Sequence, residues 1–503
     1  MIRKFRELKE RDSGVAMVWL ATTVVLLLGT AGFAVDLGWL YLNASRVQRT
    51  ADSAAMAGVI HLPGFPASAD LDARDAARAN GYDVCDPGFT GCTDTLISTP
   101  ITDSMLEVEI QTQVDSFFMA VLGFDSFDIA RESTAQYVKP VPLGSPDRCF
   151  GRDPTSTYCA DDPDGFWAAV SAPYTKRENG DPYSTRCFTP TGNAASCSSW
   201  NDEYARGGSY GGYYYAIEIP VTGYAYPDLT VRVYDAGFYG RPSDESTGDG
   251  KWSPGANDPW GTTTYSFHTV DSTPYDPTDN PAVPGCTYAL TEGQWEAALR
   301  DKWATLCSLS GPLTPGIYIF HVETSVTGSG SNHYSIAATS TAPDQPRVYG
   351  INDISIWNNT ANIGGSTNLY LVEVAAEHAG SKLELQFFDP GDAQADSWMR
   401  VHKPDGSGGF VVPTCDWESY DYSGTITNSG NEPCEWQTTD VSLADKRVFN
   451  NQWITAIIDI PDDYTCNPGS DGCFWYMELE LSDPNERTVW RARVIGNPVR
   501  LVP

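Results

Sequence analysis

One stretch of this sequence has the spacing of a serine nucleophile. Gly207-Gly-Ser209-Tyr-Gly211 matches G-x-S-x-G, a motif in which the serine of a hydrolase stands on a sharp turn between a strand and a helix. Here the following residues, Tyr215-Ala-Ile-Glu218-Ile, are typical of a strand. We therefore interpret the motif as a flexible turn and expect that the protein is not an enzyme.

Histidines and acidic loops are the residues that could hold a metal. The histidines contain no H-E-x-x-H or other close pairing, and the pair on expected neighbouring strands, His321 and His333, is interpreted as structural. Three acidic loops could present oxygen ligands to Ca²⁺, although they lack the EF-hand order and also suit simple turns. These loops are Asp235 to Asp249, Asp271 to Asp279 and Asp389 to Asp396. We predict no catalytic, cofactor-binding or metal site, and leave calcium open.

Aromatic residues offer a second kind of binding surface. The run Tyr210 to Tyr215, together with Trp252 and Trp260, could contact a sugar or a protein partner. Packing at the start of a strand explains the tyrosine run equally well. An extracellular protein or glycan ligand therefore stays an open alternative.

The cysteines fall as neighbours along the chain and contain no C-x-x-C. Zinc and thioredoxin-like sites use that short spacing, whereas an even number of local pairs indicates structural disulfides in an oxidising compartment. The expected bridges are Cys85/Cys92, Cys149/Cys159, Cys187/Cys197, Cys286/Cys307, Cys415/Cys434 and Cys466/Cys473.

Composition limits the partners. The 503 residues include 65 Asp and Glu against 32 Lys and Arg, a net charge of −33. Such a field repels nucleic acid, so nucleic-acid binding is not expected. The length suits about three domains.

One long hydrophobic run organises the chain. Gly14 to Val35 is uncharged and, at about 1.5 Å per residue, would extend roughly 33 Å, enough to cross the hydrocarbon core of a bilayer. Residues 1–13, which precede this run, are rich in basic side chains. This charge bias predicts that the N-terminus is cytoplasmic and that the chain after the helix is extracytoplasmic. The lipid bilayer is thus the first expected partner.

Small residues mark two faces of this helix. Thr30, Ala34 and Gly38 have the small-xxx-small spacing that lets membrane helices approach closely. Further along, a narrow seam of small and apolar residues continues at helical spacing: Leu40, Ala44, Val47, Ala51, Ala54 and Gly58. The seam could pack on the chain's own first domain or on a helix of another protein.

The same region resembles the TadE/TadG-like family of the Flp (Tad) pilus-assembly system. The resemblance rests on Asp12-Ser-Gly14-Val-Ala-Met, Ala34-Val-Asp36-Leu-Gly38-Trp-Leu-Tyr41 and Gln48-Arg-Thr-Ala51-Asp52-Ser-Ala-Ala55-Met-Ala57-Gly58. It implies a pilin-like α+β head, and pilus-assembly membrane proteins or pseudopilins as partners of the N-terminal helix. The von Willebrand A domain of some relatives is not expected, because Asp353-Ile-Ser355-Ile-Trp357 lacks the final serine of its metal site.

The fate of the N-terminus has three alternatives. A processed prepilin would carry an acidic residue five positions after its cleavage-site glycine, whereas Trp19 stands there after Gly14. A signal peptidase could cut after Gly32-Phe-Ala34, but the run is longer than the usual 7 to 15 residues of a signal peptide's apolar region. We expect an uncleaved anchor, starting at Met1.

The expected domain order follows from turns and periodicity. After the helix at 14–35 come a TadE/TadG-like domain at 36–139, a disulfide-stapled linker at 140–163, and β-sandwiches at 164–343 and 344–503. The first of these domains should contain a second helix from Ser68 to Gly81, a loop to Pro100, strands at Met105 to Val114 and Phe127 to Val138, and a helix at Ser116 to Leu122.

The two sandwiches are predicted from a repeat. Tyr215 to Gly237 and Tyr370 to Gly391 have the same pattern about 155 residues apart, and short alternating strands between turns are typical of β-sandwiches or jelly rolls. Gly316 to Glu323 with His333 to Thr341 should match Trp453 to Ile460 with Phe474 to Leu481. A helix is expected at Gln294 to Leu306. The strands also weakly resemble modules beside secreted peptidases.

The predicted protein is mainly β, with a transmembrane helix, a pilin-like α+β head and two repeated jelly-roll-like β-sandwiches. Its predicted function is that of a membrane-anchored, extracytoplasmic component of Flp/Tad pilus assembly or a related secretion system, with sandwiches for interaction or adhesion. A cell-surface carbohydrate- or protein-binding adhesin unrelated to pili, and a membrane-anchored hydrolase, are the alternatives.

Overall fold

A computed structural model describes most of the chain, which divides into two compact units. These are Met1–Val138 with Asn497–Pro503, and Lys139–Gly496. The described residues are 2–62, 65–102, 104–138, 140–159, 166–172, 181–182, 212–236, 261–271, 276–290, 299–324, 330–359, 366–388, 390, 397–421, 424–438, 449, 452–467, 471–480, 485–496 and 499–502.

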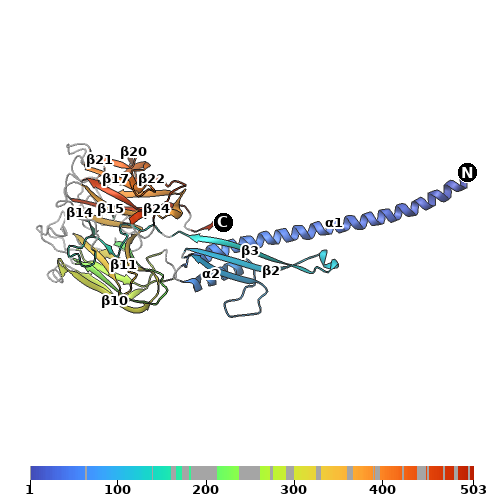
Figure 1. Cartoon of the computed structure of the whole chain (residues 1–503), viewed down its shortest axis with the longest axis horizontal. Coiled ribbons are helices and arrows are strands. Elements are labelled where there is room, and N and C mark those ends of the chain that lie inside the picture. Colours follow the sequence, from blue (N-terminus) through green and yellow to red (C-terminus); the bar gives the residue numbers. More distant parts are fainter. Residues whose placement is uncertain are drawn as a thin grey trace, which may run out of the picture. The chain divides into compact units, whose positions relative to one another are not determined.

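The smaller unit is an α+β domain on a long helix, in which β2 and β3 run alongside α1 (Figure 1). Its antiparallel sheet has the order β1-β2-β3-β25. The elements are α1 (Ile2–Val59), α2 (Pro66–Ala79), β1 (Thr95–Thr102), β2 (Met105–Asp115), the 3₁₀ helix η1 (Met119–Leu122), β3 (Ser126–Tyr137) and β25 (Val499–Val502).

The seam of small residues packs inside this unit. Val47, Ala51 and Ala54 are fully buried in one core with the sheet and α2. At Gly58 the approach is closest, because a Cβ there would lie 2.5 Å from the carbonyl oxygen of Ala69 in α2. Of the two alternatives left by the sequence, the seam thus packs on the chain's own first domain.

Three features of the smaller unit differ from expectation. Strand β1 replaces the second part of the expected loop, because Leu96 is buried beneath α2 and the strand pairs with β2. The helix expected at Ser116 to Leu122 is the single 3₁₀ turn η1. The last strand, β25, pairs with β3 and not with the second sandwich, to which residues up to 503 had been assigned.

The larger unit is built from three sheets. The largest has eleven strands, in the order β10-β7-β12-β5-β14-β24-β16-β22-β19-β20 with β4 beside β12. The other two have five strands each. Their orders are β13-β6-β11-β8-β9, and β15-β23-β17-β18 with β21 beside β17. The strands are β4 (Cys149–Phe150), β5 (Phe166–Ser171), β6 (Gly212–Ile219), β7 (Tyr226–Tyr234), β8 (Thr263–His268), β9 (Ala282–Leu290), β10 (Trp303–Leu313), β11 (Gly316–Thr324), β12 (Ser331–Thr339), β13 (Arg347–Ile351), β14 (Asp353–Asn359), β15 (Ser366–Glu373), β16 (Lys382–Phe388), β17 (Ser397–Pro404), β18 (Phe410–Val411), β19 (Thr414–Tyr420), β20 (Ile426–Pro433), β21 (Glu435–Thr438), β22 (Trp453–Asp459), β23 (Phe474–Glu480) and β24 (Asn485–Ile495).

The two repeats meet edge to edge in the large sheet. Strands β5 and β14 pair antiparallel, with Trp167 opposite Trp357, and the order outward from this pair is β12-β7-β10 on one side and β24-β16-β22 on the other. The five-stranded sheets repeat in the same way, since β6-β11-β8 corresponds to β15-β23-β17. One continuous core contains residues of both repeats.

This topology corrects three expectations. The strands equivalent to β11 and β12 are β23 and β24, one strand later than the pattern match placed them. The expected linker contributes Val141, Leu143 and Phe150 to the core. The last part of the helix expected at 294–306 is a strand, because β10 begins at Trp303. Residues 291–298 lie outside the described residues.

The disulfide prediction is confirmed wherever the structure describes it. Bonds join Cys85 to Cys92, Cys149 to Cys159, Cys286 to Cys307, Cys415 to Cys434 and Cys466 to Cys473. The expected pair Cys187/Cys197 lies outside the described residues.

Candidate membrane-proximal site

Several of the residues proposed for chemistry lie outside the described residues. These are Gly207 to Gly211, Trp252 and Trp260. Strand β6 begins at Gly212, directly after the G-x-S-x-G motif. Within β6, Tyr213 and Tyr215 are buried in the core, whereas Tyr214 is only partly buried and stacks on His321.

The histidines that the sequence placed on neighbouring strands lie in different sheets. His321 is in β11 of a five-stranded sheet and His333 is in β12 of the large sheet. His321 has His268 as its neighbour instead, with ring centroids 6.5 Å apart. Near the end of α1, His61 pairs with Asp72 at 2.7 Å. These arrangements are structural contacts.

His321 lies in a buried environment that changes its titration. Its ring stacks on Tyr214 at a centroid distance of 4.2 Å, and its Nε2 has no hydrogen-bond partner among the described residues. Burial, with a smaller contribution from His268, lowers the pKa of His321 to about 4. The ring is therefore neutral at pH 7, as burial without a carboxylate partner dictates.

The acidic loops show turn geometry where they are described. Asp276 accepts hydrogen bonds from the backbone N–H and the hydroxyl of Thr278, at 2.9 and 2.6 Å. Most of the other two loops lies outside the described residues. In the part of the chain that the structure does describe, no cluster of His, Cys, Asp and Glu has the geometry of a metal site.

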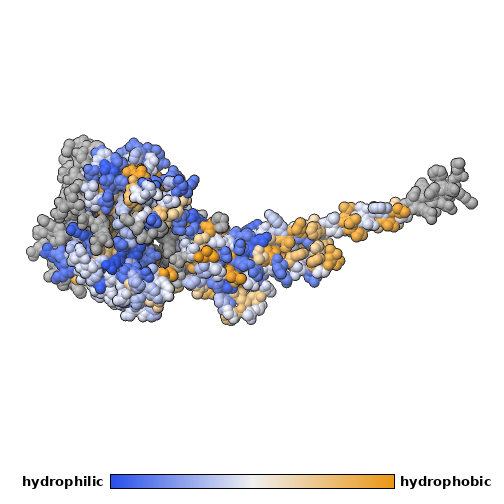
Figure 2. Space-filling view, in the orientation of Figure 1, coloured by the Kyte–Doolittle hydropathy of each residue, from blue (hydrophilic) through white to orange (hydrophobic). Residues whose placement is uncertain are grey.

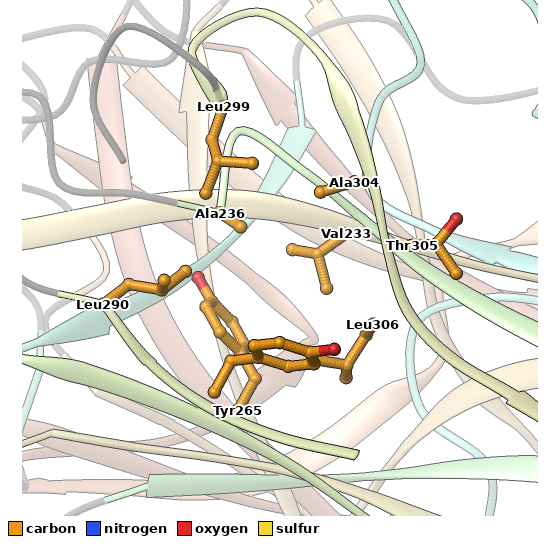
Figure 3. A pocket seen from close by; sticks show the side chains of 9 residues that line it. Val233, Ala236, Tyr265, Leu290, Leu299, Ala304, Thr305 and Leu306 are labelled. Atoms are coloured by element: carbon orange, nitrogen blue, oxygen red, sulfur yellow. The ribbon is translucent and has the colours of Figure 1, made fainter. Parts of the chain in front are cut away.

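A cavity of about 50 Å³ lies in the first sandwich (Figure 3). Val233, Leu290, Leu299 and Leu306 point into it, and the ring of Tyr265 forms part of its wall. Its volume is far below the 300 to 1,000 Å³ typical of ligand pockets.

A buried polar contact lies at the end of the predicted membrane span. Asp36 is the first charged residue after the apolar run, and only 4% of its surface is exposed. Its carboxylate accepts hydrogen bonds from the backbone N–H groups of Phe117, Phe118 and Met119, at 3.0, 2.8 and 2.6 Å. Carboxylates that accept several backbone N–H groups form strong, orienting contacts. Asp36 thus fixes the β2–β3 hairpin to α1.

Aromatic and small residues complete this contact. The Phe117 ring lies 5.5 Å from that of Trp39. The Phe118 ring covers Gly32, where an added Cβ would lie 2.9 Å from it. A larger residue at position 32 would displace the hairpin. The sequence analysis missed this site because its partners are more than 80 positions apart, and the visible clue was an acidic residue directly ending an apolar run.

The comparison with known protein families gives a match in this same N-terminal region. By length and composition, the part of α1 from Gly14 to Val59 could cross a membrane, alone among the helices described. A family model described as Flp pilus-assembly TadE/G-like covers α1 from Gly14 and nearly all of α2. Residues 14–77 match the Tad family. The resemblance seen in the sequence is therefore confirmed for this TadE/G-like region.

Beyond the TadE/G-like region the comparisons add little. The chain is similar to the PBSX exported protein XepA, with 9% identity and a TM-score of 0.15 over 57% of this chain and 82% of that one. A secreted protein from Parabacteroides distasonis shows 6% identity and a TM-score of 0.12 over 71% and 99%. At these TM-scores neither likeness carries an argument. No curated protein matches the sequence significantly.

Proposed function

We propose that this protein is a membrane-anchored, extracytoplasmic component of a Flp/Tad-type pilus-assembly or related secretion system. The observation that carries the proposal is the match of residues 14–77 to the TadE/G-like family. That match covers the apolar helix and the seam by which α1 packs on its domain.

The compartment is argued from charge and disulfides. Five basic residues precede the apolar run, a bias that keeps the N-terminus in the cytoplasm. Disulfides persist on the opposite, oxidising side, and five bonded pairs follow the helix. Both arguments support the proposal that the α+β domain and the sandwiches lie outside the cytoplasm.

On this proposal the sandwiches act by binding and not by catalysis. They form a large folded unit after the TadE/G-like region, and their partners are other components of the machine or an outer surface. The role of α1 is to hold this unit at the membrane.

Gene deletion in the native bacterium, followed by complementation, tests the proposal. We expect the deletion strain to lack pili, as seen by electron microscopy, and to lose surface attachment. Expression of the wild-type chain should restore both. Leu26→Arg combined with Leu27→Arg should fail to restore pili because it charges the apolar run, whereas the matched change of both residues to Ile should succeed. Unchanged pili and unchanged attachment after deletion would contradict the proposed role in pilus assembly.

Orientation is tested separately. Protease added to cells stripped of their outer layers should digest the sandwiches and leave the N-terminus intact. Cleavage of the N-terminus alone would show that the orientation is opposite to the predicted one.

A further inference from the structure

We propose that the tip of the β2–β3 hairpin, residues 116–124, enters the outer half of the bilayer beside α1 and gives the protein a second membrane contact. We call these residues the hairpin tip. This inference rests on one part of the proposed function, that α1 crosses the membrane.

The depth of the hairpin tip follows from its contact with α1. Phe118 packs on Gly32, which lies inside the uncharged run Gly14 to Val35. Three residues separate Gly32 from the end of that run, or roughly 4 to 5 Å along the helix. If α1 spans the bilayer with this run, Phe118 lies at the level of the hydrocarbon and not of the water outside.

The composition of the hairpin tip fits that depth. Residues 116–124 read Ser-Phe-Phe-Met-Ala-Val-Leu-Gly-Phe and carry no charge, while Asp115 and Asp125 bound them on either side. Val121 and Leu122 are 86% and 72% exposed. Figure 2 shows hydrophobic residues along the described part of α1 and again at the end of the hairpin. A contiguous exposed apolar patch of this kind marks a membrane or protein contact.

The backbone of the hairpin tip is also prepared for an apolar surrounding. Within lipid, unpaired backbone groups are costly, so non-helical segments need partners for them. Asp36 accepts the N–H groups of residues 117 to 119, and the N–H of Ser116 donates to the carbonyl oxygen of Asp125 at 2.9 Å. The N–H groups of Val121 and Gly123 donate to carbonyl oxygens within the turn.

Aromatic residues mark the expected membrane–water interface just beyond the apolar run of α1. Trp39 lies against the hairpin tip through Phe117, and Tyr41 is exposed two positions further along α1. Tryptophan and tyrosine gather at membrane–water boundaries. The occupant that fits the patch is therefore lipid, continuous with the lipid around α1.

Fluorescence quenching in vesicles tests the inference. The full chain is reconstituted into phosphatidylcholine vesicles, chosen because the net charge of −33 disfavours anionic lipid. Val121→Cys, and independently Leu122→Cys, receive an environment-sensitive dye, and wild type treated in the same way gives the background. Leu26→Cys in the apolar run and Leu501→Cys in β25, which pairs with the opposite end of β3, are the lipid and water references.

The expected result is that nitroxide-bearing lipid quenches the Val121 and Leu122 labels as strongly as the Leu26 label, while aqueous iodide quenches the Leu501 label alone. Quenching of the tip labels by iodide would place the tip in water and overturn the inference. Shielding from both quenchers would assign the patch to a protein contact and overturn it equally. If the Leu26 label also behaves like the Leu501 label, the membrane anchor itself has failed, and with it the proposed function.

Discussion

At the scale of single residues, Asp36 and His321 owe their roles to partners that are distant in the sequence. Asp36 ends an apolar run and accepts three backbone N–H groups from the hairpin tip. His321 lies on a central strand, stacked on Tyr214 and buried. In each case the polar group has been removed from water, so its state depends on the local structure.

Replacing Asp36 should release the hairpin from α1. In Asp36→Ala, the amides of Phe117, Phe118 and Met119 lose their acceptor, and we expect their hydrogen exchange in detergent to accelerate by at least tenfold. Asp52→Ala is the matched control on the same helix, because Asp52 contacts Gln48 one turn away and should leave these amides unchanged. Equal exchange in Asp36→Ala and wild type would contradict the anchoring role.

Burial of His321 predicts a pH dependence of stability. Its pKa falls from 6.5 to about 4 on folding, so between these values the unfolded chain binds the proton more tightly and stability decreases as the pH falls. The loss should reach about 2 kcal/mol at pH 5 relative to pH 8. Urea unfolding at the two pH values measures it.

His321→Gln is the comparison for this measurement, because glutamine does not titrate. The variant should lose that part of the pH dependence while remaining folded at pH 8. An identical pH profile in the variant and the wild type would show that His321 is not the titrating group.

At the scale of elements, close approach and cross-links fix the packing. The α1 seam uses alanine and glycine, so α2 and the sheet come near its axis. In the first sandwich, the Cys286–Cys307 bond joins β9 of a five-stranded sheet to β10 of the large sheet. This bond therefore ties the two layers of the sandwich together.

Gly58 should tolerate no side chain. An added Cβ would lie 2.5 Å from the Ala69 carbonyl oxygen and 2.6 Å from Leu106, so Gly58→Ala should destabilise the smaller unit by about 1 to 3 kcal/mol. The matched control is Gly38→Ala on the same helix, where nothing lies within 4 Å and helix propensity favours alanine. Thermal unfolding in detergent compares them, and equal melting temperatures would refute the close-contact argument.

The cross-sheet disulfide should contribute more than the one in the 149–159 loop. Cys286→Ser with Cys307→Ser opens a loop with a sequence separation of 21 residues and is expected to cost about 2 to 4 kcal/mol. Cys149→Ser with Cys159→Ser opens a separation of 10, in a loop also held by the five hydrogen bonds that Asp153 accepts from residues 155 to 159. Melting temperatures of the two double variants test the order, and the reverse order would contradict it.

At the scale of the whole molecule, both ends of the described chain belong to the smaller unit. The larger unit is inserted between β3 and β25, which pair in one sheet. Within the larger unit, the repeats share the eleven-stranded sheet and a continuous core. We therefore expect the two sandwiches to unfold together.

Removing the last strand should affect the smaller unit selectively. A chain ending at Gly496 leaves the outer edge of β3 unpaired, so hydrogen exchange at Thr134 to Tyr137 should accelerate. The amides of β5, in the shared sheet of the larger unit, should keep their protection. Unchanged exchange in β3 would show that β25 adds nothing to the sheet.

The sequence alone determined what depends on local pattern. The apolar run, the helical seam and the neighbouring cysteines act within a few turns or short loops, so length, periodicity and spacing were sufficient. The mainly β class and the repeat were likewise readable from alternating strands. The sequence matched β11 and β12 to strands of the second repeat that come one strand too early. Several strands have similar alternating patterns, and such a pattern does not show which strands pair.

Tertiary structure decided everything that joins distant positions. Asp36 meets residues 117 to 119 because β2 and β3 run along α1, and Val499 to Val502 return to β3 after more than 360 intervening residues. His321 and His333 lie on strands close in sequence, yet the chain crosses between sheets from β11 to β12. Such pairings depend on which surfaces bury one another, and the core that selects them exists once the whole chain has folded.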